Sequence, residues 1–148
     1  MDLRDASIRA TFSEDHHRCD ELWTQVERAA DAGNRDEAQR AWQAFRDAME
    51  RHFRMEEEIV FPAFESATGM LAGPTAVMRS EHAQMRQLME RMDAAAGAGD
   101  LSALADHGDT LLMIIQQHNV KEEGMLYPMA DRALGPQMAD LGERLRPF

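Results

Sequence analysis

The chain of 148 residues has the length of one ordinary domain, and its net charge of −11 argues against binding to nucleic acid or to anionic membranes. A core of this size needs no disulfide support, and the single cysteine, Cys19, cannot form an internal disulfide. No apolar run is long enough to span a bilayer, and the first ten residues lack the apolar segment of a signal peptide. We therefore expect one cytoplasmic domain over residues 1–148, with no nucleic acid or membrane partner, either a monomer or an oligomer of unknown size.

Apolar residues recur at steps of three and four along four stretches, which predicts four amphipathic helices. The first runs from about residue 4 to 31, the second from about 35 to 66, the third from about 74 to 96 and the fourth from about 100 to 133. The apolar stripe of the fourth helix includes Ile115 and Met125. A short helix is expected to cap the fold between residues 135 and 148.

The breaks between these helices agree with this division. Gly33-Asn34 and Gly99-Asp100 each supply a glycine that ends one helix and a polar residue that caps the next. Pro62 and Pro128 lie near the ends of the second and fourth helices, where we expect them to kink or end the helix. Short loops favour antiparallel neighbours, so the fold class is all-α, an up-down-up-down four-helix bundle.

The chain also repeats itself at an offset of 66 residues. The motif His52-x-x-x-Glu56 recurs as His118-x-x-x-Glu122, and each copy follows a lone histidine by 36 residues. Phe61-Pro62 recurs as Tyr127-Pro128 at the same offset. The repeat predicts two helical hairpins, residues 8–66 and 74–132, each with one histidine on its first helix and one His-x-x-x-Glu on its second.

The repeated polar residues lie on the apolar stripes, where an ionised glutamate is costly unless it is paired or bound to a metal. Residues four apart lie one turn apart on the same helix face. Imidazole nitrogens and carboxylate oxygens together suit transition metals. The predicted ligands are His16, His52, Glu56, His82, His118 and Glu122.

This donor set suits a pair of metals, with Glu56 and Glu122 as bridges. We expect His16 and His52 on one metal and the other two histidines on the second. A single metal ion, zinc, or core histidines beside coincidental acids are the alternatives that spacing leaves open.

Helix register separates two further histidines and two further glutamates from the predicted ligands. The offset pairs His16 with His82 and leaves His17 opposite an alanine, while His107 lies too far from His118 to share its site. Glu57 and Glu123 are turned about 100° from their neighbours and are expected to face solvent or to support the site.

Tyr127 lies nine residues after His118, which places it on the opposite helix face unless Pro128 redirects the helix end. Its repeat partner is Phe61, which favours a packing role. No other side chain stands out as a proton donor for cleavage of an O–O bond.

In these motifs the chain resembles the hemerythrin-like (HHE cation-binding) family. The matching pieces are Asp15-His16, His52-Phe-Arg-Met-Glu56-Glu57 before Phe61-Pro62, Glu81-His82, and His118-Asn-Val-Lys-Glu122-Glu123 before Tyr127-Pro128. The resemblance implies a four-helix bundle that holds two Fe ions with an oxo or hydroxo bridge. It also implies binding of O₂, NO or peroxide as a small ligand.

The chain departs from the oxygen-carrying members at two points. They have a fifth histidine one turn before the ligand on the third helix, where this chain has Met78, and their last carboxylate follows its histidine by five residues, not four. We therefore expect more open metal positions than in a protected carrier, with Met78 and Cys19 near the site. The resemblance thus implies O₂, NO or peroxide binding or sensing. The alternatives are a di-iron enzyme that reduces peroxide or nitric oxide, and an iron-binding, stress-response or iron-repair module.

Overall fold

The computed structural model describes residues 7–148, which form helices joined by short turns and contain no β-strand. The α-helices are α1 (Ile8–Asp31), α2 (Arg35–Met55), α3 (Phe61–Thr68), α4 (Pro74–Gly97), α5 (Leu101–Lys121), α6 (Tyr127–Leu134) and α7 (Met138–Leu145). Two π-helical turns, η1 (Glu56–Val60) and η2 (Glu122–Leu126), join α2 to α3 and α5 to α6. A 3₁₀ turn, η3 (Gly135–Gln137), precedes α7.

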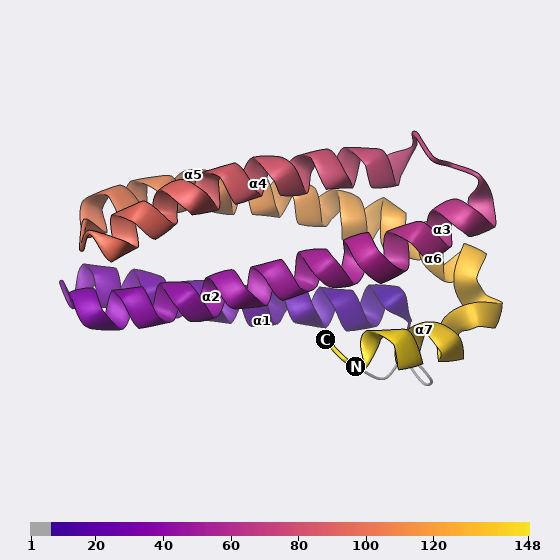
Figure 1. The fold of residues 1–148 in the computed structure, drawn as a ribbon, viewed down its shortest axis with the longest axis horizontal. Helices are drawn as coiled ribbons and strands as arrows, with labels where there is room; N and C mark the ends of the chain where they lie inside the picture. Colours follow the sequence, from indigo (N-terminus) through magenta and orange to yellow (C-terminus); the bar gives the residue numbers. More distant parts are fainter. Residues whose placement is uncertain (1–6) are drawn as a thin grey trace.

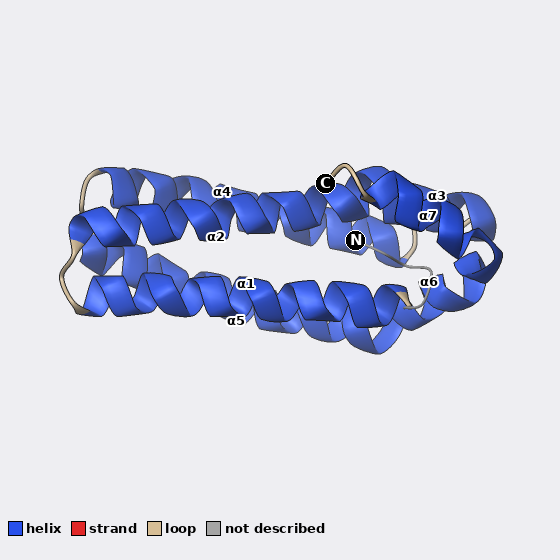
Figure 2. Cartoon of the chain, turned by 90° about the horizontal axis from the view of Figure 1, so that it is seen from below, coloured by secondary structure: helices blue, strands red, loops and turns tan. Residues whose placement is uncertain are grey.

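Four long helical rods make up the bundle, because α2, η1 and α3 form one rod and α5, η2 and α6 form another (Figure 1). The hairpin α1–α2 packs against the hairpin α4–α5, with α2 beside α4 and α1 beside α5 (Figure 2). The predicted all-α, up-down-up-down bundle and the predicted C-terminal helix are confirmed. Among the described residues, no helix has the length and apolarity needed to cross a membrane.

The helix ends follow the predicted caps. Asn34 accepts a hydrogen bond from the backbone N–H of Glu37, and Asp100 does the same for Ala103. The preceding glycines, Gly33 and Gly99, adopt left-handed φ angles of 68° and 69°. The first helix begins later than predicted, at Ile8, because the Ser7 hydroxyl caps it. Residues 4–6 of the predicted helix lie outside the described residues.

The π turns occur immediately before the two aromatic-Pro steps. The backbone N–H of Tyr127 bonds the carbonyl of Glu122, five residues back, and Phe61 bonds Glu56 in the same way. A proline lacks an N–H group and crowds the preceding helical turn, so the predicted disturbance near each proline takes the form of a wider turn. The wider turn also shifts the helix phase. Met125, predicted on the buried stripe, is therefore 50% exposed, whereas Tyr127 is fully buried.

Two apolar clusters fill the bundle, one on each side of the predicted ligands. The cluster towards the hairpin turns contains Trp23, Trp42 and Phe45, and the cluster towards α7 contains Phe12, Phe61 and Tyr127. The predicted polar residues therefore occupy a layer between two dry cores, where each unpaired polar group is costly.

Candidate metal centre

The six predicted side chains converge in one buried layer. Both glutamates and His82 have no exposed surface, and the other three histidines are at most 6% exposed. Each helical rod contributes: α1 carries His16, α4 carries His82, and the other two rods each carry one His-x-x-x-Glu motif whose glutamate begins a π turn.

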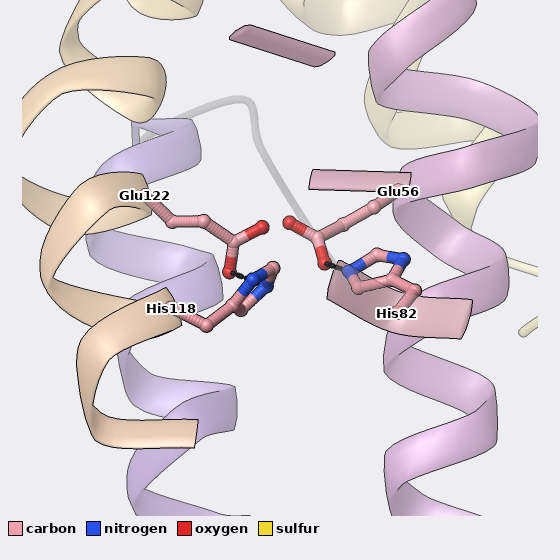
Figure 3. A group of neighbouring side chains, drawn as sticks. All are labelled: Glu56, His82, His118 and Glu122. Carbon is pink, nitrogen blue, oxygen red and sulfur yellow. Dashed lines mark ion pairs between the residues drawn. The ribbon is translucent and has the colours of Figure 1, made fainter. Parts of the chain in front are cut away.

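Each glutamate touches two histidines from different helices. Oε1 of Glu56 lies 3.2 Å from Nε2 of His52 and 3.3 Å from Nε2 of His82. In the other half of the site, Oε1 of Glu122 lies 3.1 Å from Nε2 of both His16 and His118. The two carboxylates point towards one another across the bundle axis (Figure 3).

These atoms form two adjoining groups that can each hold a metal ion. One group contains Glu56, His82, His118 and Glu122, and the other contains His16, His52 and Glu122; the donor atoms of each group lie within 4.8 Å of one another. The imidazole rings pair in the same way, since the His16 and His52 centroids are 4.6 Å apart and the His82 and His118 centroids 4.9 Å apart. The histidines that the sequence assigned to one metal thus lie side by side, while their binding of that metal stays a prediction.

A second ring of carboxylates surrounds the histidines. Each Nδ1–H group donates to a carboxylate on the neighbouring helix: His52 to Asp15 at 2.8 Å, and His82 to Glu57 at 2.9 Å. The other two pairs, His118 with Glu81 and His16 with Glu123, are also 2.9 Å apart. The four contacts link α1 to α2, η1 to α4, α4 to α5, and η2 back to α1.

Of these four carboxylates, the sequence predicted only Glu57 and Glu123 as possible supports. Both side chains are half-buried, and each accepts a hydrogen bond from the Nδ1–H group of a predicted histidine ligand. Asp15 and Glu81 were not given a role. Both precede a predicted ligand and are related by the same 66-residue offset, which is the signal that could have found them.

The four outer carboxylates determine which ring nitrogen of each histidine faces the centre of the site. When the imidazole is neutral and Nδ1 is protonated to serve the outer carboxylate, Nε2 carries a lone pair and faces a carboxylate oxygen that also only accepts. Four buried atoms accordingly have no hydrogen-bond partner among the described residues: Oε1 of Glu56, Nε2 of His82, Nε2 of His118 and Oε2 of Glu122. Acceptors that face one another in a dry core need a cation between them, so this donor set fits metal ions.

The raised pKa values of two of the histidines also show that the site favours positive charge. Burial alone lowers the pKa of His52, but the charge of Glu56 and the hydrogen bond that His52 donates to Asp15 outweigh it and raise the pKa to about 10. His82 behaves alike: its close contact with the Glu56 carboxylate and its hydrogen bond to Glu57 outweigh burial and raise its pKa to about 9. A metal ion that binds here takes the place of these protons.

Tyr127 is the residue that the sequence placed wrongly. Its hydroxyl lies 2.9 Å from Oε2 of Glu56, 3.0 Å from Oε1 of Glu122 and 3.2 Å from Nε2 of His16. The π turn η2 is the cause, because one extra residue in the turn leaves Tyr127 about 80° from His118 instead of about 180°. The repeat partner of Tyr127, Phe61, has no hydroxyl and instead stacks 5.8 Å from the His82 ring. The two halves of the site are therefore chemically different.

The remaining candidates lie around the site without joining either donor group. Cys19 is a buried free thiol whose pKa burial raises to about 12. Met78 is buried in the apolar cluster towards α7. His17 is exposed and His107 half-buried, and neither belongs to the donor groups, as register predicted.

A small cavity borders the site on the side of the larger core. It has a volume of about 10 Å³, roughly what one water molecule needs. Three of the histidines, His16, His52 and His118, line it together with apolar side chains such as Phe53 and Ile115. A small ligand in this cavity would lie directly beside the donor atoms.

Fold and site together define a four-helix-bundle protein with a buried histidine–carboxylate cluster that can hold metal. The hemerythrin HHE cation-binding domain model matches residues 7–130, and the chain belongs to this family. No curated protein and no solved structure matches the chain. Metal binding is thus supported both by the family and by unpartnered donor atoms.

Proposed function

We propose that the chain holds two iron ions, bridged by Glu56 and Glu122, and binds O₂, NO or peroxide beside them. The observation that carries this proposal is the set of four unpartnered donor atoms buried between two apolar cores. The six inner residues are the proposed ligands. Asp15, Glu57, Glu81 and Glu123 are the proposed supports that fix the histidine tautomers.

The choice of iron follows from the donors. Four imidazoles and two carboxylates offer mixed nitrogen and oxygen ligation, which suits iron, whereas the only thiol, Cys19, is outside both donor groups. Two groups that share Glu122 favour two metals over one. When bound, iron would supply the redox and ligand-binding chemistry that the protein side chains lack.

The size and the lining of the cavity support the proposed class of small ligand. Its volume of about 10 Å³ excludes anything larger than a few atoms, and its walls are mainly apolar. O₂ and NO are small and neutral, so they lose little hydration there. The chain itself contributes the dry walls and the fixed imidazoles of the three histidines that line the cavity.

Reduction of peroxide or nitric oxide is a second candidate function, which Tyr127 favours. Its hydroxyl lies 2.9 Å from Glu56 and 3.0 Å from Glu122, so the proposed metal site has a buried hydrogen-bond donor on its α7 side. This is the kind of group that the sequence did not reveal. Binding and reduction are distinguished by whether the ligand is released intact.

The test uses the iron-loaded, reduced protein mixed with O₂ in a stopped-flow spectrometer. Binding predicts an absorption band that appears with O₂ and disappears on deoxygenation. Catalytic consumption of added peroxide or NO, with no reversible band, would instead establish the reductase. An iron-loaded protein that shows neither behaviour contradicts both functions.

A further inference from the structure

The small cavity beside the site is separated from the surface by only a few side chains. A surface groove between α1 and α5, of about 620 Å³, approaches the same place from outside. Cavity and groove share Asp20 and Trp23 of α1 and Leu112 and Asn119 of α5. These four side chains therefore form the wall between solvent and the cavity.

The internal repeat allows the two halves of the bundle to be compared. The line of contact between α2 and α4, here called the α2–α4 seam, is the counterpart of the α1–α5 seam between α1 and α5. At the 66-residue offset, Asp20 corresponds to Arg86 and Asn119 to Phe53. Arg86 bonds Glu50 at 2.8 Å and Glu57 at 2.9 Å, and its guanidinium lies 5.1 Å from the Phe53 ring. Phe53 in turn stacks on His82 at 4.2 Å. The α2–α4 seam is closed by these contacts.

Leu112 shows the same contrast. Its counterpart is Arg46, which forms an ion pair with Asp93 of α4. Within residues 7–148, Asp20 and Asn119 make no side-chain hydrogen bond or ion pair across the α1–α5 seam. Arg86, Phe53 and Arg46, which close the α2–α4 seam, are thus replaced in the α1–α5 seam by residues with no side-chain hydrogen bond or ion pair across it, within residues 7–148.

Trp23 is the fixed part of the wall. Its indole packs against Gly108 of α5 so closely that an added Cβ would lie 2.3 Å from Cζ2 of Trp23. Leu112 and Asn119 are only half-buried, and Asp20 is exposed. Rotation of these side chains is therefore the least costly way to join the groove to the cavity.

We propose that small ligands reach the metal site through the α1–α5 seam, past Leu112 and Asn119, and that the acidic mouth of this route favours neutral ligands over anions. The proposal rests on the proposed function. Asp20, Glu27 and Glu123 line the groove, with Arg9 as its one cation, and the chain carries a net charge of −11. An anion such as azide meets this negative potential, whereas NO and O₂ do not.

The proposed route can be tested with substitutions that place a larger side chain in the wall between the groove and the cavity. In the iron-loaded, reduced protein, Leu112→Phe and Asn119→Phe, the latter copying Phe53 of the closed seam, should slow NO binding by about fivefold or more because opening then needs a larger rearrangement. Ile114→Phe is the matched control, because Ile114 is also half-buried on α5 but lines neither groove nor cavity. Equal slowing by the control overturns the route, and so do unchanged rates in both test variants.

A second readout does not need a bound ligand. Oxygen quenches tryptophan fluorescence on contact, and Trp23 lines both groove and cavity. Leu112→Phe and Asn119→Phe should lower the oxygen quenching constant, while Ile114→Phe should not. If wild-type protein holds iron but binds no NO, the proposed function fails, and the quenching series still decides the route.

The charge of the mouth is tested with azide and the iron-loaded, oxidised protein. Asp20→Asn should raise the rate of azide binding about threefold at low salt and leave the rate of NO binding to the reduced protein unchanged. Asp106→Asn removes an exposed charge from α5 away from the groove and should change neither rate. An equal gain from both variants, or none from Asp20→Asn, overturns the selection against anions.

Discussion

Three consecutive glutamates have three different environments, set by helix phase alone. Glu56 is fully buried between two histidines, Glu57 is half-buried against His82, and Glu58 is exposed and forms an ion pair with Arg54. Burial raises the pKa of Glu57, but hydrogen bonds from His82 and Arg86 outweigh it and lower the pKa to about 2. The three residues therefore offer a graded test of the proposed ligand set.

Alanine substitution along this series should separate ligand from support. Glu56→Ala removes a bridging carboxylate and should abolish stoichiometric iron binding. Glu57→Ala leaves the inner donors intact but frees the His82 ring, which should weaken metal affinity about 10–100-fold. Glu58→Ala should leave metal binding unchanged. Metal titration under anaerobic conditions measures all three, and equal behaviour of the first two variants would contradict the assignment.

Tyr127 hydrogen-bonds to both Glu56 and Glu122, the two proposed bridging carboxylates, and Phe61 shows that a phenylalanine fits the equivalent position. In metal-free protein, Tyr127→Phe should lower the free energy of unfolding by about 1–3 kcal/mol, because two buried carboxylates lose a donor. In iron-loaded protein the metal satisfies them, so the loss should be smaller. Urea unfolding with and without iron tests this, and equal losses in both states would refute a role for the hydroxyl between the carboxylates.

The helical elements show which features sequence can reveal. Periodicity and glycine caps located the helices. The 66-residue offset correctly predicted that His16 and His82 lie in the same layer of the bundle. The π turns were not visible, because a helix pattern assumes a constant 100° step. Tyr127 and Met125 were therefore placed on the wrong faces. Asp15 and Glu81 were missed because each serves a histidine on a neighbouring helix, a contact that no single-helix pattern contains.

The packing of α1 on α5 depends on a residue without a side chain. Gly108→Ala would gain helix propensity but place its Cβ 2.3 Å from the Trp23 ring, so we expect a net loss of about 1–3 kcal/mol in stability. Gly97 near the end of α4 has open space around it, and Gly97→Ala should be neutral or stabilising. Urea unfolding curves check both.

Adding Trp23→Phe to Gly108→Ala should recover part of that loss, because the smaller ring leaves room for the new methyl group. A double variant no more stable than predicted from independent effects would show that Trp23 is not the contact that matters.

At the scale of the whole molecule, the site layer lies between two apolar cores that do not depend on it. The cluster around Trp23, Trp42 and Phe45 and the cluster around Phe12 and Phe61 each bury large side chains. The fold should therefore survive without metal, although the buried charged groups of the site are then poorly matched. Metal that binds only the folded chain adds stability by mass action.

Removal of iron by a chelator should accordingly leave the far-ultraviolet circular dichroism nearly unchanged and lower the Tm. Readdition of ferrous iron should restore the Tm. A chain that unfolds on chelation would show that the two cores do not suffice, and an unchanged Tm would show that iron does not bind the folded layer.

The central claim is that the inner residues hold two iron ions, and the metal content of the purified protein tests it most directly. Elemental analysis after anaerobic reconstitution with ferrous iron should give about two irons per chain, with binding lost in Glu56→Ala but retained in Glu58→Ala. One metal per chain, preferential retention of zinc, or iron that persists in Glu56→Ala would contradict the di-iron site.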